Sequence, residues 1–226
     1  MRSVVLCVLC GVALLGLAGC NIVGGTAALL APPEKVEAKY ELPDKPTLIV
    51  IDDASPRPMV NSEATLRRVA GSIRAALEAE EVVTTGFIGQ DELAALREEL
   101  GDEYRQTSLA ALAIRLNARQ VIHAEVSGYQ VDVGGNIIRP SIVMNVKVFD
   151  IDERARVFPS AVDPETGFSV GDSVYPVQTN MPARNVSGQG AARTIAVRDL
   201  ADMAGRDIAR LFFDWRVPER GSTLGE

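Results

Sequence analysis

Two long segments, 119–133 and 140–152, alternate apolar and polar residues and constrain the fold of this chain more than any other feature. Successive side chains of a β-strand point to opposite faces of a sheet, so this alternation predicts two strands with one buried face each. Gly134, Gly135 and Asn136 separate the segments, and residues of these types favour a tight turn. The sequence therefore predicts an antiparallel hairpin.

The apolar residues also predict the register of this hairpin. A three-residue turn places Val133 opposite Ile137. Ala124 then faces Val146, and the apolar faces of both strands coincide. A two-residue turn sets apolar residues opposite polar ones, which divides the apolar face. We therefore expect the three-residue turn. The opposite, more polar face carries His123, Glu125, Ser127, Asn145 and Lys147.

Apolar runs and periodic apolar residues predict the remaining elements. β-Branched and aliphatic runs predict strands over 47–53 and 81–89. Apolar residues at helical spacing predict helices over 62–77, 90–100, 109–116 and 197–215. This order predicts an α+β fold, in which a mixed β-sheet has helices packed mainly on one face. We expect one domain over 47–217, because roughly 200 residues suit a single core.

The N-terminus has the pattern of a secretory signal peptide. Arg2 provides a positive charge, and residues 4–18 are almost all apolar or small. This run is about 15 residues long, whereas a membrane span needs about 20. It ends in the tetrapeptide LAGC, which closes with Gly19 and Cys20. We therefore expect a signal peptide over 1–19 that is cleaved between Gly19 and Cys20.

The tetrapeptide resembles the lipobox of bacterial lipoproteins. That resemblance implies that the thiol of Cys20 is acylated, with palmitate among the groups expected, and that Cys20 becomes the mature N-terminus. Two or more acyl chains hold a protein stably on a bilayer. The expected location is the bacterial cell envelope, anchored by lipid and facing the periplasm. Asn21 replaces the Asp that marks inner-membrane retention in some bacteria, which favours the outer membrane over the inner.

Proline and glycine residues interrupt regular structure on both sides of the predicted domain. Residues 20–46 are expected to form the lipidated N-terminus and a flexible tether, which reaches about 85–90 Å when fully extended. Residues 153–190 contain several prolines and glycines, with short strands expected near 154–158 and 168–178. The last residues, 218–226, are expected to form a loose tail.

Cysteine content and charge exclude several classes of function. Cys7 and Cys10 leave with the signal peptide and Cys20 carries lipid, so no thiol remains for a disulfide or a metal. The chain has 30 acidic against 23 basic residues and a formal net charge of −7. Nucleic-acid binding needs concentrated positive charge, so we expect no nucleic-acid partner.

The order of elements resembles a group of bacterial envelope lipoproteins. This group contains the curli-secretion lipoprotein family, the lipoprotein activators of penicillin-binding proteins, and the N-terminal domain of the Tol-system propeller protein. The resemblance implies an anticodon-binding-domain-like sandwich and covers roughly 47–152. One departure is Asn117-Ala118, where the group often has Gly-Ala. The matching positions are Leu112, Ala113, Leu116, Asn117, Ala118, Val121, Ile122 and Ala124.

Catalytic and metal-binding patterns are weak. His123, the single histidine, shares a strand face with Glu125, and this pair is the one arrangement suggestive of a hydrolase or a metal enzyme. A transition-metal site usually has further His or Cys ligands, which the mature chain lacks. Acids at the strand ends offer oxygens for Ca²⁺, but without the spacing of an EF-hand, and we expect them to be solvated. These acids are Asp52, Asp53, Asp150, Asp152 and Glu153.

The sequence therefore favours a non-enzymatic protein without metal or cofactor. We expect a lipid-anchored envelope protein that docks on another envelope protein to assemble, activate or scaffold it. The alternative is an accessory, ring-forming subunit of an envelope transport or secretion complex, which would be a homo-oligomer. Candidate partner contacts are Tyr175, Met181 and Phe213.

Overall fold

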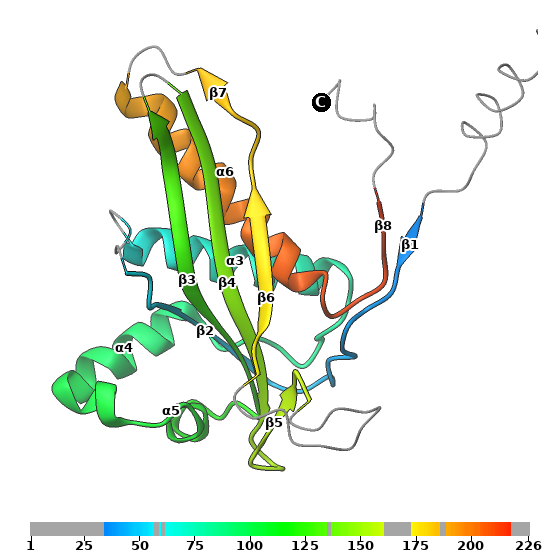
Figure 1. Cartoon of the computed structure of the whole chain (residues 1–226). Helices are drawn as coiled ribbons and strands as arrows, with labels where there is room; N and C mark the ends of the chain where they lie inside the picture. Colours follow the sequence, from blue (N-terminus) through cyan, green and yellow to red (C-terminus); the bar gives the residue numbers. More distant parts are fainter. Residues whose placement is uncertain are drawn as a thin grey trace, which may run out of the picture. The chain divides into compact units, whose positions relative to one another are not determined.

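The computed structural model (Figure 1) separates the chain into two units. One unit contains β1 (Lys35–Val36), which pairs antiparallel with β8 (Trp215–Arg216). The other unit, Glu37–Asp214, holds all the other helices and strands. Gly19 and Cys20 lie outside the described residues, as does the tail 218–226. The structure describes residues 34–56, 59, 62–134, 137–160, 173–185 and 189–217.

A six-stranded mixed sheet forms the centre of the larger unit (Figure 1). Its strands β2, β3 and β4 lie in that order, with β2 parallel and β4 antiparallel to β3. Three short strands then pair antiparallel with successive parts of β4. The predicted α+β fold with a mixed sheet is confirmed. The strands are β2 (Thr47–Asp53), β3 (Gln120–Gly134), β4 (Ile137–Asp150), β5 (Ala155–Phe158), β6 (Tyr175–Asn180) and β7 (Arg184–Asn185).

The hairpin of β3 and β4 has the predicted register in the core, but not the predicted turn. Ala124 pairs with Val146, as expected from the apolar faces. At the turn, however, Gly134 pairs with Ile137, so the expected pairing of Val133 with Ile137 is wrong. The difference arises from irregularities within β3, where the pairing shifts register between Val126 and Gly128 and again closer to the turn.

The bulge at Ser127 changes which residues of β3 face the core. Before it, Val126 and the even-numbered residues that precede it are buried; after it, the odd-numbered Tyr129 and Val131 take that side. A single extra residue reverses the alternation of a strand. The bulge therefore keeps the buried residues of both halves of β3 on the same side of the sheet. The buried residues of β4, which alternate with more exposed ones without interruption, lie on that side too.

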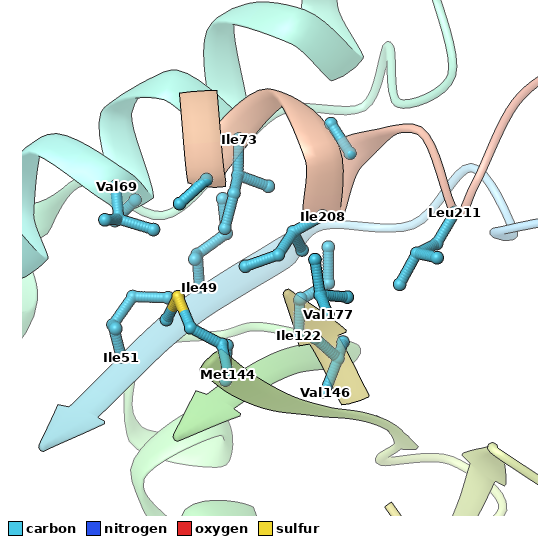
Figure 2. Packing of buried hydrophobic residues seen from close by; sticks show 14 of the residues in the cluster. Ile49, Ile51, Val69, Ile73, Ile122, Met144, Val146, Val177, Ile208 and Leu211 are labelled. Atoms are coloured by element: carbon cyan, nitrogen blue, oxygen red, sulfur yellow. The ribbon is translucent and has the colours of Figure 1, made fainter. Parts of the chain in front are cut away.

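Two long helices, α3 (Ser62–Ala79) and α6 (Gln189–Ala209), cover one face of the sheet. In Figure 2, Ile49, Ile122 and Val146 of the strands point toward Val69 and Ile73 of α3 and Ile208 of α6. Burial of such aliphatic side chains is the main favourable contribution to folding. The main core of the protein lies on this face. It also includes Ile51, Leu77, Ala124, Met144, Val148, Leu200 and Ala204.

Two shorter helices pack on the opposite face, near the start of β2. They are α4 (Gln90–Leu100) and α5 (Leu109–Arg115), joined by a 3₁₀ helix over Gly101–Gln106. Gly101, at φ 52°, ends α4, and the hydroxyl of Ser108 accepts a hydrogen bond from the N–H of Ala111 at the start of α5. The prediction of helices mainly on one face thus holds for the two long helices but not for α4 and α5. A second core cluster lies between these short helices and the sheet, and it includes Leu48, Val50, Leu93, Ala113 and Val121.

The strand predicted over 81–89 is wrong. Only an isolated bridge joins Phe87 to Thr47 in this region, and Gly86 has a φ of 109°. The carboxylate of Asp44 accepts hydrogen bonds from the backbone N–H groups of Thr84 and Thr85, at 2.8 and 2.9 Å. These N–H groups therefore bond to a side chain rather than to a neighbouring strand. The two threonines consequently lie in a loop that the Asp44 carboxylate holds in place.

The compact unit begins at Glu37 rather than at residue 47. The N–H groups of Lys39 and Tyr40 both donate to the carbonyl of Leu211, and Leu42 is 7% exposed. Residues 37–46, expected to belong to the tether, are therefore part of the compact unit. The last helix is also displaced: α6 begins at Gln189 and ends at Ala209, so the expected continuation to residue 215 is wrong.

A glycine permits the close crossing of the two long helices. A Cβ atom at Gly205 of α6 would lie 2.5 Å from Cβ of Ser72 and 2.7 Å from the carbonyl oxygen of Val69, both on α3. Real Cβ atoms do not approach other atoms so closely. The backbone of α3 provides one of these contacts, so rotation of a side chain cannot relieve the clash.

We predict that Gly205→Ala lowers the free energy of unfolding by about 1–3 kcal/mol, the usual cost of overpacking a core. The matched control is Gly71→Ala in α3, where a Cβ atom would meet nothing within 4 Å. Removing a glycine from a helix interior stabilises by about 0.5–1 kcal/mol. Urea denaturation followed by circular dichroism measures both values. Equal effects of the two substitutions would contradict the close crossing.

Candidate functional site

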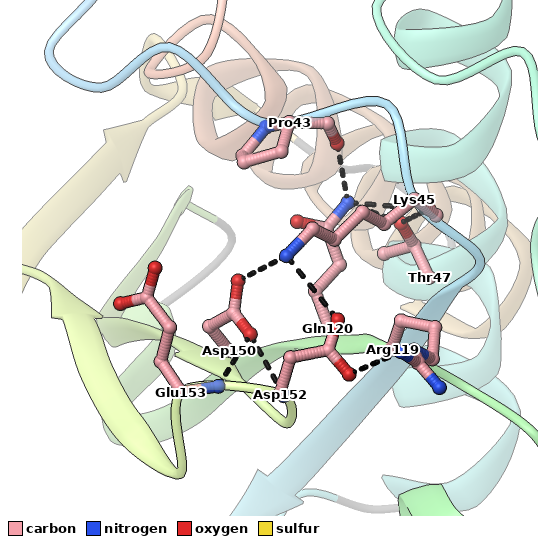
Figure 3. A network of polar contacts seen from close by, with 8 residues as sticks. All are labelled: Pro43, Lys45, Thr47, Arg119, Gln120, Asp150, Asp152 and Glu153. Carbon is pink, nitrogen blue, oxygen red and sulfur yellow. Dashed lines mark hydrogen bonds and ion pairs between the residues drawn. The ribbon is translucent and has the colours of Figure 1, made fainter.

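A polar network closes the end of the sheet where β2 and β3 begin (Figure 3). Gln120 is 1% exposed, and its Nε2 donates to the carbonyl of Pro43 at 2.8 Å and to Oγ1 of Thr47 at 2.7 Å. Lys45 Nζ lies 2.6 Å from Oδ2 of Asp150. The network therefore ties the segment before β2 to the start of β3 and the end of β4.

Both carboxylate oxygens of Asp150 have partners. Oδ1 accepts from the backbone N–H groups of Asp152 and Glu153, at 2.8 and 3.0 Å, while Oδ2 contacts Lys45. Burial acts to raise the pKa of Asp150, but the Lys45 ammonium and the two N–H groups outweigh it and hold the pKa below its ordinary value. Asp152 contacts Arg119 at 2.6 Å as well as Lys45. These acids stabilise the turn after β4.

The grouping of acids considered for Ca²⁺ is not formed. Asp52 and Asp53 lie at the end of β2, whereas Asp150 pairs with Gln120, which is level with the start of β2, so the two groups are separated by the length of that strand. Asp53 instead accepts from the N–H groups of Ser55 and Met59. Within the described part of the chain, no three His, Cys, Asp or Glu side chains are placed to hold a metal ion. The expectation that all these acids are solvated is wrong for Asp150, which is 5% exposed.

The second face of the sheet is open beyond the short helices. In Figure 1, α3 and α6 lie behind β3, β4 and β6, and no helix lies in front of these strands. This part of the face is polar and half-buried or exposed, as the alternation predicted. We call it the open sheet face and define it by Asp52, His123, Glu125, Asn145, Lys147 and Gln178.

His123 has a partner that the sequence did not indicate. Its Nε2 lies 2.9 Å from Oδ2 of Asp52, with side-chain exposures of 15% and 45%. Glu125 is on the same face, as predicted, but it lies opposite Asp52 in the register rather than bonded to His123. The hydroxyl of Ser127 donates to the carbonyl of Val143 at 3.3 Å. The arrangement thus provides a histidine–carboxylate contact and further hydrogen-bonding groups on one sheet face, and no described hydroxyl is bonded to the histidine.

The three predicted partner contacts do not form one surface. Met181 is 4% exposed and belongs to the main core, so its side chain is not available as a surface contact. Tyr175 is half-buried, with its ring 5.2 Å from that of Phe158. Phe213 is also half-buried and packs against the main core. Both aromatic residues therefore contribute to packing and present only part of their side chains to solvent.

Comparisons with known proteins found solved structures that are similar to this chain. The sequence matches no protein-family model and no curated relative. None of the described helices is long and apolar enough to span a membrane. Two of the similar solved structures are themselves named as lipoproteins.

Three solved structures illustrate this similarity. The PelC dodecamer from Paraburkholderia phytofirmans has a TM-score of 0.38 at 12% identity, and covers 80% of this chain and 98% of its own. Lipoprotein GNA1162 from Neisseria meningitidis has a TM-score of 0.41 at 10% identity, with 70% and 95% coverage. The LpoB C-terminal domain from Salmonella enterica has a TM-score of 0.33 at 13% identity, with 65% and 84% coverage.

We predict that Asp150→Asn destabilises the protein at neutral pH by about 1.5–3 kcal/mol, because it removes the charge from a buried hydrogen-bond acceptor. A carboxyl whose pKa is lower when folded stabilises above about pH 4 and loses this contribution as the pH falls through the folded pKa. The difference between variant and wild type should therefore narrow below about pH 4. Urea denaturation at several pH values measures it.

The matched control for this prediction is Asp152→Asn. Asp152 is 35% exposed, and exposed ion pairs contribute about 0–1 kcal/mol, so a smaller loss is expected. Equal losses for the two variants, or a difference that does not change with pH, would contradict the role assigned to Asp150.

Proposed function

We propose that this protein is a non-enzymatic lipoprotein of the bacterial cell envelope, anchored through Cys20. The observation that carries the proposal is the signal-peptide pattern that ends in LAGC. The expected anchor consists of acyl chains on the cysteine, because two or more chains hold a protein stably on a bilayer. No nucleic-acid partner, metal or cofactor is part of this proposal.

The anchor and the compact unit are joined by a segment of limited length. The compact unit begins at Glu37, which leaves residues 21–36 between it and the lipid site. At 3.3–3.6 Å per residue, this segment reaches at most about 58 Å. The greatest distance between the lipid site and the compact unit is therefore shorter than the 85–90 Å expected from the sequence. The partner therefore has to lie within this distance, plus the length of the compact unit itself, of the membrane that holds the acyl chains, with the outer membrane favoured.

We further propose that the open sheet face binds another envelope protein, which this chain assembles, activates or scaffolds. The face carries charges of both signs: Lys147 lies opposite His123 across the strands, and Glu125 lies opposite Asn145. Asp52 and Lys147 are of opposite sign and lie on either side of β3. Complementary charges on a partner would set the orientation of binding more than its strength.

We predict that Cys20→Ala abolishes acylation and releases the protein from membranes. Cells labelled with an alkyne analogue of palmitate should show a labelled band for the wild type and none for the variant. Sucrose-gradient fractionation should place the wild type with outer membranes. Cys10→Ala is the matched control, because this cysteine lies in the predicted signal peptide and should change neither result. Acylation of the Cys20→Ala variant would contradict the anchor.

We predict that a photocrosslinking residue at Asn145 or Gln178, on the open sheet face, yields a discrete adduct heavier than the chain in intact cells. Ala75 is the matched control, because it is exposed on α3 in the opposite layer. An adduct of twice the chain mass would instead favour the ring-forming alternative. Equal adducts from Ala75, or none from the open sheet face, would contradict docking there.

A further inference from the structure

A cavity of about 440 Å³ lies between α3, α6 and β3. It belongs to the face of the sheet opposite the open sheet face, near the first half of α6. Its volume is within the 300–1,000 Å³ typical of small-molecule sites. Tyr129 of β3 and Val197 and Ala201 of α6 contribute apolar lining, and three arginines contribute charge: Arg68, Arg193 and Arg198.

Positive charge is concentrated around this cavity, although the whole chain has a net charge of −7. Two of the arginines, Arg193 and Arg198, come from α6, and Arg68 comes from α3. No aspartate or glutamate is among the lining residues. Asp202 lies beside the cavity and contacts Nη2 of Arg68 at 2.7 Å, and the charges of Asp202 and Asp199 raise the pKa of Arg68.

Two of these guanidinium groups have unused hydrogen-bonding capacity. Nε of Arg68 is buried and has no hydrogen-bond partner within the described structure. Leaving a buried donor unsatisfied is costly, and the cost is larger for a charged group. Arg198 is exposed and forms no ion pair with any described residue. An anion placed between the helices would accept from both groups.

We propose that this cavity binds a small organic anion, in which a phosphate or carboxylate is attached to a short apolar group. The arginines recognise the anionic group, because guanidinium forms paired hydrogen bonds with oxyanions. The apolar group packs against Tyr129, Val197 and Ala201. This chemistry is shared by a lipid headgroup with part of its chain and by a free metabolite. The site is independent of the open sheet face and of the lipid on Cys20.

The test uses the full chain, purified in a neutral maltoside detergent, and titrates hexyl phosphate by isothermal calorimetry. We expect saturable binding of one hexyl phosphate per chain, weaker binding of inorganic phosphate, and none of hexanol. Competition with phosphatidylglycerol vesicles then identifies the source of the ligand. Displacement of hexyl phosphate by these vesicles, but not by phosphatidylcholine vesicles, indicates a lipid; no displacement by either indicates a free anion.

Single substitutions identify the site. Arg198→Gln should weaken the binding of hexyl phosphate by about tenfold or more, as expected for loss of a charged hydrogen bond. Its side chain is exposed, so folding should be retained, which circular dichroism checks. Arg115→Gln is the matched control, because this exposed arginine lies on α5, away from the cavity. Absence of saturable binding, or equal affinities for wild type and Arg198→Gln, would overturn the proposal.

Discussion

The antiparallel pairing of β3 with β4 is the interaction on which the rest of the sheet depends, because every other strand of the larger sheet pairs with one of these two. β2 adds to the free edge of β3, and β5, β6 and β7 add to successive parts of β4. Because of the bulge at Ser127, the residues of β3 that contribute to the main core lie on one side both before and after it, and those of β4 lie on the same side. A sheet with one continuous apolar face can then bury it under α3 and α6.

The two faces of this sheet consequently have different properties. One is closed by long helices that cross closely at Gly205, and a cavity with three arginines remains where α3, α6 and β3 diverge. The other is closed only near the start of β2 and elsewhere presents polar groups from four strands. The network around Gln120 and Asp150 neutralises its own charges and secures the end of the sheet. We therefore propose the open sheet face and the cavity as binding sites, and assign a stabilising role to the network.

Sequence periodicity was informative wherever local spacing decides the structure. The apolar residues of the hairpin predicted the pairing of Ala124 with Val146, although the turn was wrong, because alternation reports which residues share a face and not where an extra residue is inserted. The segment 81–89 was misassigned for a related reason. Its β-branched residues favour a strand, but Asp44, distant in sequence, binds the N–H groups that a strand would have used.

The amino-acid sequence alone predicted the α+β class, the hairpin with its apolar and polar faces, and a lipid-anchored chain that leaves no cysteine for a disulfide or a metal. These features depend on residue type and local spacing, so they can be predicted without knowing which distant segments are in contact. Only the tertiary structure decided that His123 meets Asp52, that Met181 is buried, and that arginines of α3 and α6 share a cavity. Each of these depends on which segments, far apart along the chain, pack together, and local periodicity carries no information about that choice.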